Sequence, residues 1–313
     1  MQPSSKTVLP KKRPLRRDLK RNYDLYLMVI PAVIAIFIFN YLPMVGVQIA
    51  FRNFKPARGI WGSPWVGMKW FERFFNTNYF SDLFFNTLFL SLYSLAATFP
   101  IPIILAIILN QYRSQGFKRI LQTVSYAPHF ISTVVMVGMI TIFLSPSTGL
   151  YGHLTRAMGG TPQNLLGSAD AFRSIYVWSD VWQHSGWDSI IYLAALTSID
   201  PTLYEAATID GATRMQKIRH LELPLLLPTI CILLIMRVGN LMTVGFEKVY
   251  LLQNNLNVRT SEVFATYVYK VGLTQSPQYS YSAAVGLFST LINLVLLTSC
   301  NAVVRKLSDN SLW

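Results

Sequence analysis

Long apolar runs dominate the pattern of this chain and are separated by shorter polar segments. A helix needs about 20 apolar residues to cross a bilayer, and six runs reach this length. They cover roughly 24–51, 80–109, 120–144, 171–199, 221–245 and 279–304. The fourth run is the weakest because it contains Asp180, His184 and Asp188. The pattern predicts an all-α membrane protein built as a bundle of six spanning helices.

Six spans place both termini on the same side of the membrane. Lys and Arg are more frequent in the segments of that side than in the three opposite loops, and cytoplasmic segments carry this excess. The segments of that side are the N-terminal tail 1–23, the loops 110–119 and 200–220, and the C-terminal tail 305–313. We therefore expect both termini to be cytoplasmic. The long opposite loops, near 52–79, 145–170 and 246–278, either face an extracellular partner or close the outer face of the bundle.

Composition supports a membrane protein. The chain has 313 residues, of which 52% are hydrophobic and 13% are charged, whereas a soluble domain carries about 25% charged residues. The net charge of +13 would suit a nucleic-acid partner. However, Lys and Arg crowd into the first 21 residues, directly before the first apolar run, and no nucleic-acid-binding motif accompanies them. They are typical of an orientation signal, so nucleic acid is not an expected partner.

No sequence motif for catalysis or for metal binding is present. The chain lacks the G-x-x-x-x-G-K-[ST] phosphate loop, so we do not expect it to hydrolyse ATP itself. Cys231 and Cys300 both lie inside apolar runs, where a cysteine behaves as a small buried hydrophobe. We therefore expect no metal site, and the chain is predicted to be no enzyme.

The polar loop 200–220 predicts two short helices joined by a turn. Asp200 is placed to cap the first helix, with Pro201 at its first position. Gly211 breaks this helix and is suited to a turn with a positive φ. Each helix has an apolar side: Leu203, Ala206 and Ala207 on the first, and Met215 and Ile218 on the second. These apolar residues require a partner groove or the lipid interface, unless the loop is an ordinary amphipathic connector.

This loop resembles the E-A-A motif of type I ABC importer permeases. The family pattern is E-A-A, three residues, G, nine residues, then I-x-L-P. Here it reads Glu205-Ala206-Ala207, then Gly211, then Leu221-Glu222-Leu223-Pro224, with Leu221 for the usual Ile. Asp210-Gly211-Ala212 resembles the sequence found at this position in the carbohydrate branch of the family. Further segments resemble the branch that imports complex oligosaccharides: Tyr41-Leu42-Pro43, Phe51-Arg52-Asn53-Phe54, Ala127-Pro128-His129-Phe130 and Gly245-Phe246-Glu247.

The resemblance implies an ATP-driven, binding-protein-dependent importer of oligosaccharides in the bacterial cell membrane, working by alternating access. The implied partners are two cytoplasmic ATPase subunits, an extracellular solute-binding protein, and a second homologous permease or a second copy of this chain. ATP and Mg would be used by the ATPase, and this chain would bind no cofactor. By position, the implied ATPase contacts are Glu205, Ala206, Ala207, Asp210, Gly211, Met215 and Ile218.

Ionisable residues inside two spans are candidates for the substrate pathway, because each costs about 2.5–3.5 kcal/mol to insert. Asp180, His184 and Asp188 share one helical face by their spacing of four, and Arg237 is predicted at nearly the same depth as His184. Arg237 either forms a structural ion pair with one aspartate or belongs to a polar lining for sugar hydroxyls, where it could bind a uronic-acid carboxylate. The candidate pathway residues are Trp178, Trp182, Gln183, His184, Trp187, Asp188, Arg237 and Asn240.

Three other functions compete with this interpretation. A permease of the same family for amino acids or another small polar solute is disfavoured by the D-G-A sequence and the long outer loops. A secondary transporter or channel is disfavoured by the single E-A-A loop and by the lack of an inverted repeat. A membrane-anchored scaffold would show no solute-stimulated ATPase activity with its partners.

Overall fold

The computed structural model describes residues 22–112, 114–274 and 276–307. Helices make up nearly all of the regular structure in this part of the chain, and its one β-bridge joins Arg52 and Trp65. Of the predicted tail 1–23, the described part includes only the last two residues, and all basic residues of the tail lie outside it. Residues 308–313 of the predicted C-terminal tail also lie outside it.

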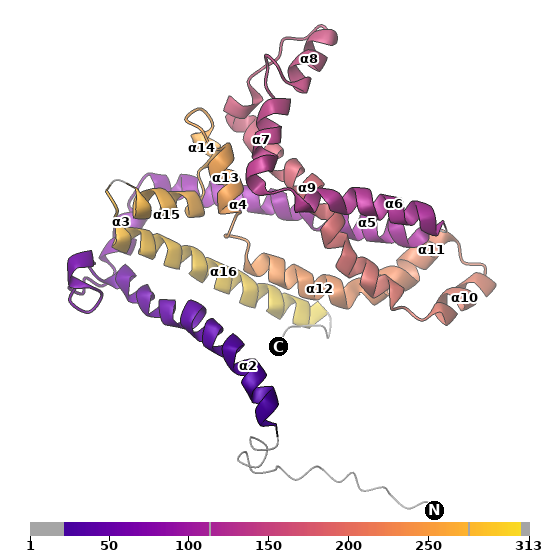
Figure 1. Cartoon of the computed structure of the whole chain (residues 1–313), viewed down its shortest axis with the longest axis horizontal. Coiled ribbons are helices and arrows are strands. Elements are labelled where there is room, and N and C mark those ends of the chain that lie inside the picture. The colour runs from indigo at the N-terminus through magenta and orange to yellow at the C-terminus, as the bar shows by residue number, and fades with distance from the viewer. Residues whose placement is uncertain (1–21, 113, 275, 308–313) are drawn as a thin grey trace, which may run out of the picture.

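The first span is a continuous helix that stands apart from the bundle (Figure 1). It consists of α2 (Tyr23–Ile36), a π-helical turn (Phe37–Tyr41) and a 3-10 segment (Leu42–Phe51). No residue of α2 is buried within the chain. The 3-10 segment makes the contact with α16, and Ala50 near its end packs with Phe71 and Ala284. Because lipid is as apolar as these side chains, exposure on this scale suits a membrane helix.

Four further long helices form the body of the molecule and extend along its longest axis (Figure 1). The second span is α4 (Tyr79–Thr98) followed by α5 (Pro100–Gln111). The others are α9 (Ala169–Thr197), α12 (Leu223–Gly239) and α16 (Tyr279–Leu307). In the described part of the chain, four unbroken helical segments are apolar and long enough to cross a membrane: Tyr23–Phe51, Tyr79–Gln111, Arg214–Gly239 and Tyr279–Lys306. The charged helix α9 is not among them.

The apolar run 120–144 forms two helices rather than one. α6 (Gln115–Tyr126) continues into a 3-10 turn (Ala127–Phe130), and α7 (Thr133–Phe143) leaves at 99° to that segment. Pro128 supplies no N–H at the break, and Ser132 starts a new helix by accepting a hydrogen bond from the Val135 N–H at 3.4 Å. If this bent pair crosses the membrane as one unit, the described chain has five apolar spans.

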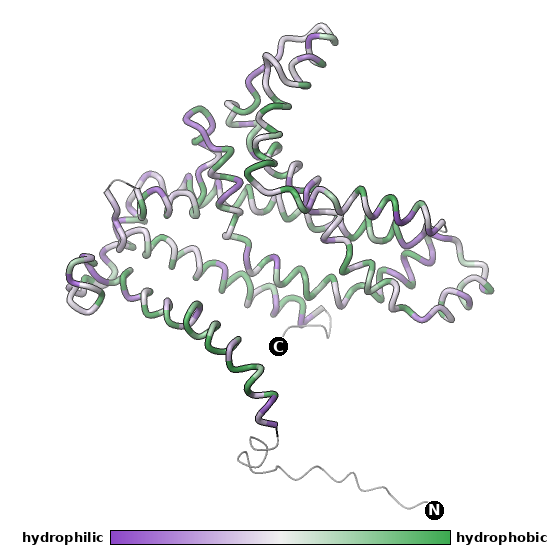
Figure 2. The backbone as a smooth tube through the Cα atoms, in the orientation of Figure 1, coloured by the Kyte–Doolittle hydropathy of each residue, from purple (hydrophilic) through white to green (hydrophobic). Residues whose placement is uncertain are grey.

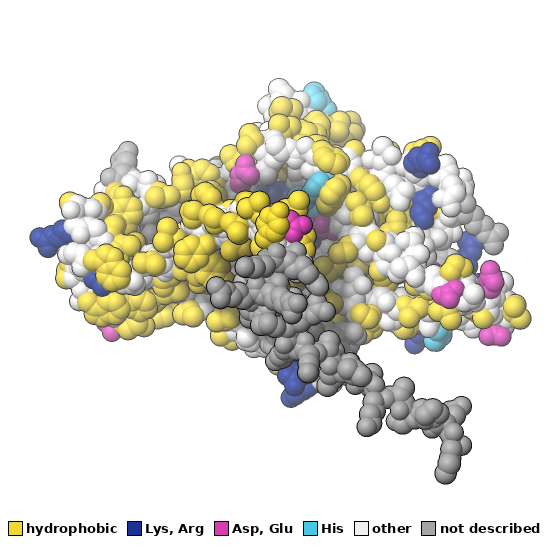
Figure 3. Space-filling model, turned by 60° about the horizontal axis from the view of Figure 1, so that its bottom comes forward, with side chains coloured by type: hydrophobic (Ala, Val, Ile, Leu, Met, Phe, Trp, Pro, Cys, Tyr) yellow, Lys and Arg dark blue, Asp and Glu magenta, His cyan; other side chains and the backbone are white. Residues whose placement is uncertain are grey.

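Shorter elements gather at the ends of the long helices. One end and the top of Figure 1 hold α3 (Lys69–Phe75), α8 (Leu150–Ala157), α13 (Phe246–Leu252), α14 (Val258–Ser261) and α15 (Phe264–Leu273), with 3-10 turns at Pro56–Arg58 and Leu165–Gly167. The other end holds α10 (Pro201–Ile209) and α11 (Arg214–Lys217). Apolar residues follow the long helices (Figure 2), and charged side chains gather mainly towards the two ends of the face in Figure 3.

Candidate functional site

The loop 200–220 folds as a helix, a turn and a second short helix. α10 (Pro201–Ile209) begins at Asp200, whose Oδ1 accepts a hydrogen bond from the Thr202 N–H at 2.9 Å. Hydrogen bonds from Thr202 lower the pKa of the Asp200 carboxyl, so the cap stays ionised. Gly211 ends the helix with φ +73°, a conformation that glycine adopts without a Cβ clash. The predicted cap and the predicted glycine turn are both confirmed.

The second arm of the loop is fixed by local hydrogen bonds. Thr213 caps α11 (Arg214–Lys217) in a capping box, in which the Gln216 side chain accepts from the Thr213 N–H at 2.7 Å. Lys217 Nζ donates to Thr208 Oγ1 at 2.6 Å and ties the second arm to α10. A π-helical turn (Ile218–Glu222) then leads directly into α12. The second arm is therefore continuous with α12, whereas residues 198–200 separate α10 from α9.

The residues of the E-A-A resemblance form a concave surface on this loop. A pocket of about 460 Å³ is lined by Ala206, Ala207, Asp210 and Gly211, together with residues of the second arm. Glu205 is exposed beside it, and Met215 is 70% exposed. Ile218 differs: it is half-buried and lines a separate pocket against the end of α5. The structure thus separates Met215 and Ile218, which the sequence placed on one side.

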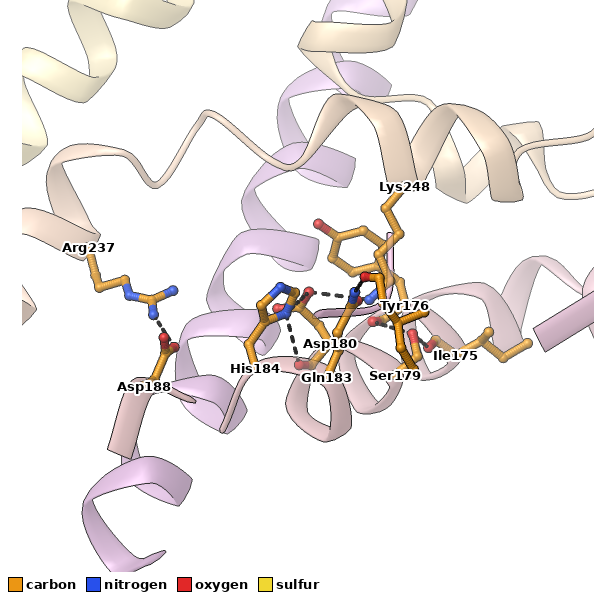
Figure 4. Close-up of polar contacts among 10 residues, drawn as sticks. Ile175, Tyr176, Ser179, Asp180, Gln183, His184, Asp188, Arg237 and Lys248 are labelled. Atoms are coloured by element: carbon orange, nitrogen blue, oxygen red, sulfur yellow. Dashed lines mark hydrogen bonds and ion pairs between the residues drawn. The ribbon is translucent and has the colours of Figure 1, made fainter. Parts of the chain in front are cut away.

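Two clusters of charge link α9 to later helices (Figure 4). Arg237 of α12 forms an ion pair with Asp188. Asp180 Oδ1 lies 3.2 Å from Lys248 Nζ and 3.2 Å from His184 Nδ1. Of the two aspartates considered for Arg237, the structure therefore selects Asp188, and Asp180 has its own cation. The paired charges lower the cost of placing ionisable groups among apolar helices.

Polar residues line a cavity between α4, α9 and α12. The cavity has a volume of about 280 Å³, and its lining includes Asp180, Arg237, Asn240 and the hydroxyl-bearing residues Ser91, Ser94, Thr98 and Thr243. A neighbouring pocket of about 530 Å³ contains Trp187, Asp188 and Arg237. Arg237 therefore faces both spaces, and its side chain is 48% exposed. This arrangement offers hydroxyl, amide and guanidinium groups to a polyhydroxylated ligand.

The tryptophans among the candidate pathway residues differ in how much of each ring is exposed. Trp178 and Trp182 are each about half exposed, and Trp178 Nε1 donates to Tyr93 Oη at 2.9 Å. Trp187 is stacked on His129, with ring centroids 4.4 Å apart and planes 2° apart. One face of Trp187 is therefore covered, and the ring braces the bend after α6.

Gln183 lies away from the open surface. It is 3% exposed, and its Nε2 donates to the Ile131 carbonyl at 2.8 Å. The residue points towards the break between α6 and α7. In this conformation Gln183 holds the main chain of the break and does not line either cavity.

Comparison with known proteins shows to which family the chain belongs. The family model described as "Binding-protein-dependent transport system inner membrane component" matches residues 98–309. The chain belongs to this family. It is 42% identical over 303 residues to the polygalacturonan/rhamnogalacturonan transport system permease protein YteP of Bacillus subtilis, an alignment that covers 97% of the chain and 94% of the relative. The predicted family is confirmed.

Two solved structures confirm the fold of this permease. A bacterial ABC transporter involved in the import of the acidic polysaccharide alginate contains a chain that matches with a TM-score of 0.87 at 40% identity, covering 94% of this permease and 99% of that chain. A bacterial alginate ABC transporter in complex with an alginate pentasaccharide-bound periplasmic protein matches with a TM-score of 0.88 at 39% identity, covering 96% and 100%. The permease is an inner-membrane component of an ABC importer.

Sequence reasoning missed Lys248, which it counted among the residues of an outer loop. In the permease, Lys248 is buried on α13, and its Nζ lies 3.2 Å from Asp180 and 5.1 Å from the Tyr176 ring centre. Its position directly after Gly245-Phe246-Glu247 was the available signal. The sequence could not show that α13 folds back against α9.

Sequence reasoning also gave no role to Glu222, the variable position of the L-E-L-P segment. Glu222 is completely buried, and its Oε1 accepts hydrogen bonds from Asn110 Nδ2 at 3.0 Å, Gln111 Nε2 at 2.8 Å and Tyr204 Oη at 3.2 Å. Burial, and then the neighbouring Glu222 charge, raise the pKa of the Tyr204 phenol to about 12. Tyr204 therefore keeps its proton as a donor. An acidic residue at the start of an apolar span was the available signal.

Proposed function

We propose that this permease forms half of the translocation pathway of an importer for acidic oligosaccharides. Its relative YteP is named for polygalacturonan and rhamnogalacturonan, and the two matching structures are named for alginate. All three names describe polymers that carry uronic-acid carboxylates. The observation that carries the proposal within this chain is the half-exposed Arg237 between two cavities, since a guanidinium binds a carboxylate bidentately.

In this proposal the carboxylates of the substrate compete with Asp188 for Arg237. The ion pair keeps Arg237 oriented when the pathway is empty, and the five N–H donors of the guanidinium allow a second acceptor to bind. The hydroxyl-bearing residues of the 280 Å³ cavity would bind sugar hydroxyls beside it. Trp178 and Trp182 would offer exposed ring faces to the apolar side of the sugar rings.

The remaining partners follow from the same proposal. A second homologous permease, or a second copy of this chain, completes the pathway, and a solute-binding protein delivers the substrate from outside. Two ATPase subunits, which use ATP and Mg, bind the concave surface of the coupling loop 200–220. Both termini then lie in the cytoplasm, and this chain binds no cofactor. The pocket beside Ala206, Ala207 and Gly211 supports the ATPase contact.

The variant Arg237→Gln tests the acidic substrate. The complete importer is reconstituted in liposomes, and uptake of an oligogalacturonate is compared with uptake of its methyl-esterified, neutral counterpart of the same length. We expect the variant to lose at least about tenfold more uptake of the acidic substrate than of the neutral one, because one charged hydrogen-bonded contact is worth about 1.5–3 kcal/mol. Arg58→Gln, in an exposed turn remote from α12, is the matched control. Equal loss for both substrates would refute the carboxylate contact.

A further inference from the structure

Glu222 lies where three elements of the permease meet. The residue itself ends the π-helical turn that opens α12, Asn110 and Gln111 end α5, and Tyr204 lies in the middle of α10. The side chains of Asn110, Gln111 and Tyr204 all donate to the same carboxylate oxygen, at 3.0, 2.8 and 3.2 Å. Asn110 Nδ2 also lies 3.4 Å from Tyr204 Oη. The cluster therefore joins α10 to two long helices through one acceptor.

Because Glu222 is buried, its carboxylate depends on its hydrogen-bond donors. Glu222 has no exposed surface, and a buried carboxylate is tolerated only where donors replace water. Its Oε2 has no hydrogen-bond partner among the described residues, so Oε1 and its three donors carry the whole interaction. Any movement of α10 relative to α5 would break bonds in a low-dielectric site, where hydrogen bonds are strong and their loss is costly. Relative movement of these elements is therefore opposed.

Other contacts of α10 do not replace this link. Lys217 binds Thr208, but both residues belong to the coupling loop itself. The remaining side-chain bonds recorded for α10 are also local: Thr208 Oγ1 donates to the Tyr204 carbonyl. Within the described part of the chain, Tyr204 is thus the α10 side chain with a hydrogen bond to a long helix.

We propose that Glu222 is a positioning residue that fixes α10 to α5 and α12, so that a displacement of α10 moves both long helices as one body. The inference rests on the proposed function, because the displacement is the one that the ATPase would impose. Glu222 contacts neither the ATPase pocket nor the cavities around Arg237. Its effect would be on the transmission of movement, and not on binding at either site.

The first test measures how much substrate is carried for each ATP hydrolysed by the reconstituted importer. We expect Glu222→Ala and Tyr204→Phe to lower this ratio, by at least about tenfold for Glu222→Ala, while ATP hydrolysis continues. Tyr204→Phe removes only the phenol oxygen, and it provides the test if the Glu222→Ala protein does not assemble into the importer. Glu72→Gln on the exposed side of α3 is the control for a changed glutamate. If transport and hydrolysis fall together, in proportion to the amount of assembled complex, Glu222 has only a structural role.

A second test does not need the substrate. Spin labels at the exposed positions Thr202 and Tyr112, in a background with Cys231→Ser and Cys300→Ser, report the distance between α10 and the end of α5. In the assembled wild-type complex we expect one narrow distribution that is the same without nucleotide and with ATP trapped. Glu222→Ala should broaden it. An unchanged narrow distribution in Glu222→Ala would overturn the proposal, even if acidic oligosaccharides prove to be the wrong substrate.

Discussion

At the scale of single residues, the permease pairs Asp180 and Asp188 of α9 with separate cations. Asp188 has Arg237, and Asp180 has Lys248 and His184. The two pairs differ in exposure, because the Lys248 side chain is 6% exposed and the Arg237 side chain is 48% exposed. An exposed pair can exchange partners with little penalty, whereas a buried pair that loses one member leaves an uncompensated charge. The Asp180 pair is therefore the structural one of the two.

Removal of the buried cation should destabilise the permease. Lys248→Met leaves Asp180 without its ammonium partner, and we expect a loss of about 2 kcal/mol, less than for a completely buried pair because Asp180 is partly exposed. The midpoint of thermal unfolding in detergent measures the effect. Lys270→Met breaks the more exposed pair with Glu262 and should cost less than about 1 kcal/mol.

A double variant distinguishes the ion pair from simple packing. Asp180→Asn removes the charge that Lys248→Met leaves alone, so the two changes together should restore part of the stability that Lys248→Met loses. Coupled residues deviate from additivity in this way. Strictly additive losses would show that the two side chains do not depend on each other.

At the scale of elements, the bend between α6 and α7 is held by α9. Gln183 binds the Ile131 carbonyl, and Trp187 stacks on His129. Gly186, between them, allows the closest approach: a Cβ at this position would lie 1.9 Å from the Ser125 carbonyl oxygen. Small residues let membrane helices pack backbone to backbone. Three consecutive contacts along α9 therefore fix the geometry of the broken segment.

Gly186→Ala should disturb this crossing. The added methyl group meets main-chain atoms, which cannot rotate away, and we expect a loss of about 1–3 kcal/mol, as for other overpacked sites. Thermal unfolding of the detergent-solubilised permease provides the measurement. Gly286→Ala on α16 is the matched control, since nothing lies within 4 Å of its added Cβ. An equally stable Gly186→Ala protein would mean that α6 and α9 separate at little cost.

The sequence predicted the elements whose signals are local. Apolar length predicted the long helices, and Asp200 and Gly211 predicted the bounds of α10 from capping chemistry and backbone conformation. Contacts between distant segments were out of reach. Glu222 depends on residues 18 and 112 positions away, and no periodicity reports such a contact. For the same reason the sequence could not show that Gln183, a candidate pathway residue, binds the main chain of the α6–α7 break.

At the scale of the whole molecule, the chain presents separate apolar surfaces to separate surroundings. α2 buries no side chain within the chain, and the far end of the molecule exposes Ile209 and Met215 at 87% and 70%. The first surface is long and apolar beyond the first turn of α2, which holds Asp24, as a lipid-facing or permease-facing helix requires. The second is small and lies beside the charged residues of the coupling loop, as expected for an ATPase contact.

Disruption of the apolar surface around Ile209 and Met215 should release the ATPase but not the second permease. Ile209→Asp places a charge at the end of α10, and we expect co-purification to lose most of the ATPase while the second permease is retained, because the two contacts lie on different surfaces. Leu256→Asp makes the same change in a loop near α14, where the leucine is 69% exposed, and should leave the ATPase bound. Loss of both partners from Ile209→Asp would indicate a folding defect.

The pairing of α9 with later helices also sets an order of events during synthesis. Arg237 follows Asp188 by 49 positions, and Lys248 follows Asp180 by 68. When α9 leaves the ribosome, its two countercharges on α12 and α13 have not yet been made. α2 can enter lipid alone as an apolar helix, because its Asp24 lies in the first turn. We expect α9, by contrast, to remain beside the insertion machinery or other polar surfaces until α12 arrives. We therefore expect α9 to be integrated together with α12, and the nascent chain to be most vulnerable to quality control between the synthesis of α9 and that of α13.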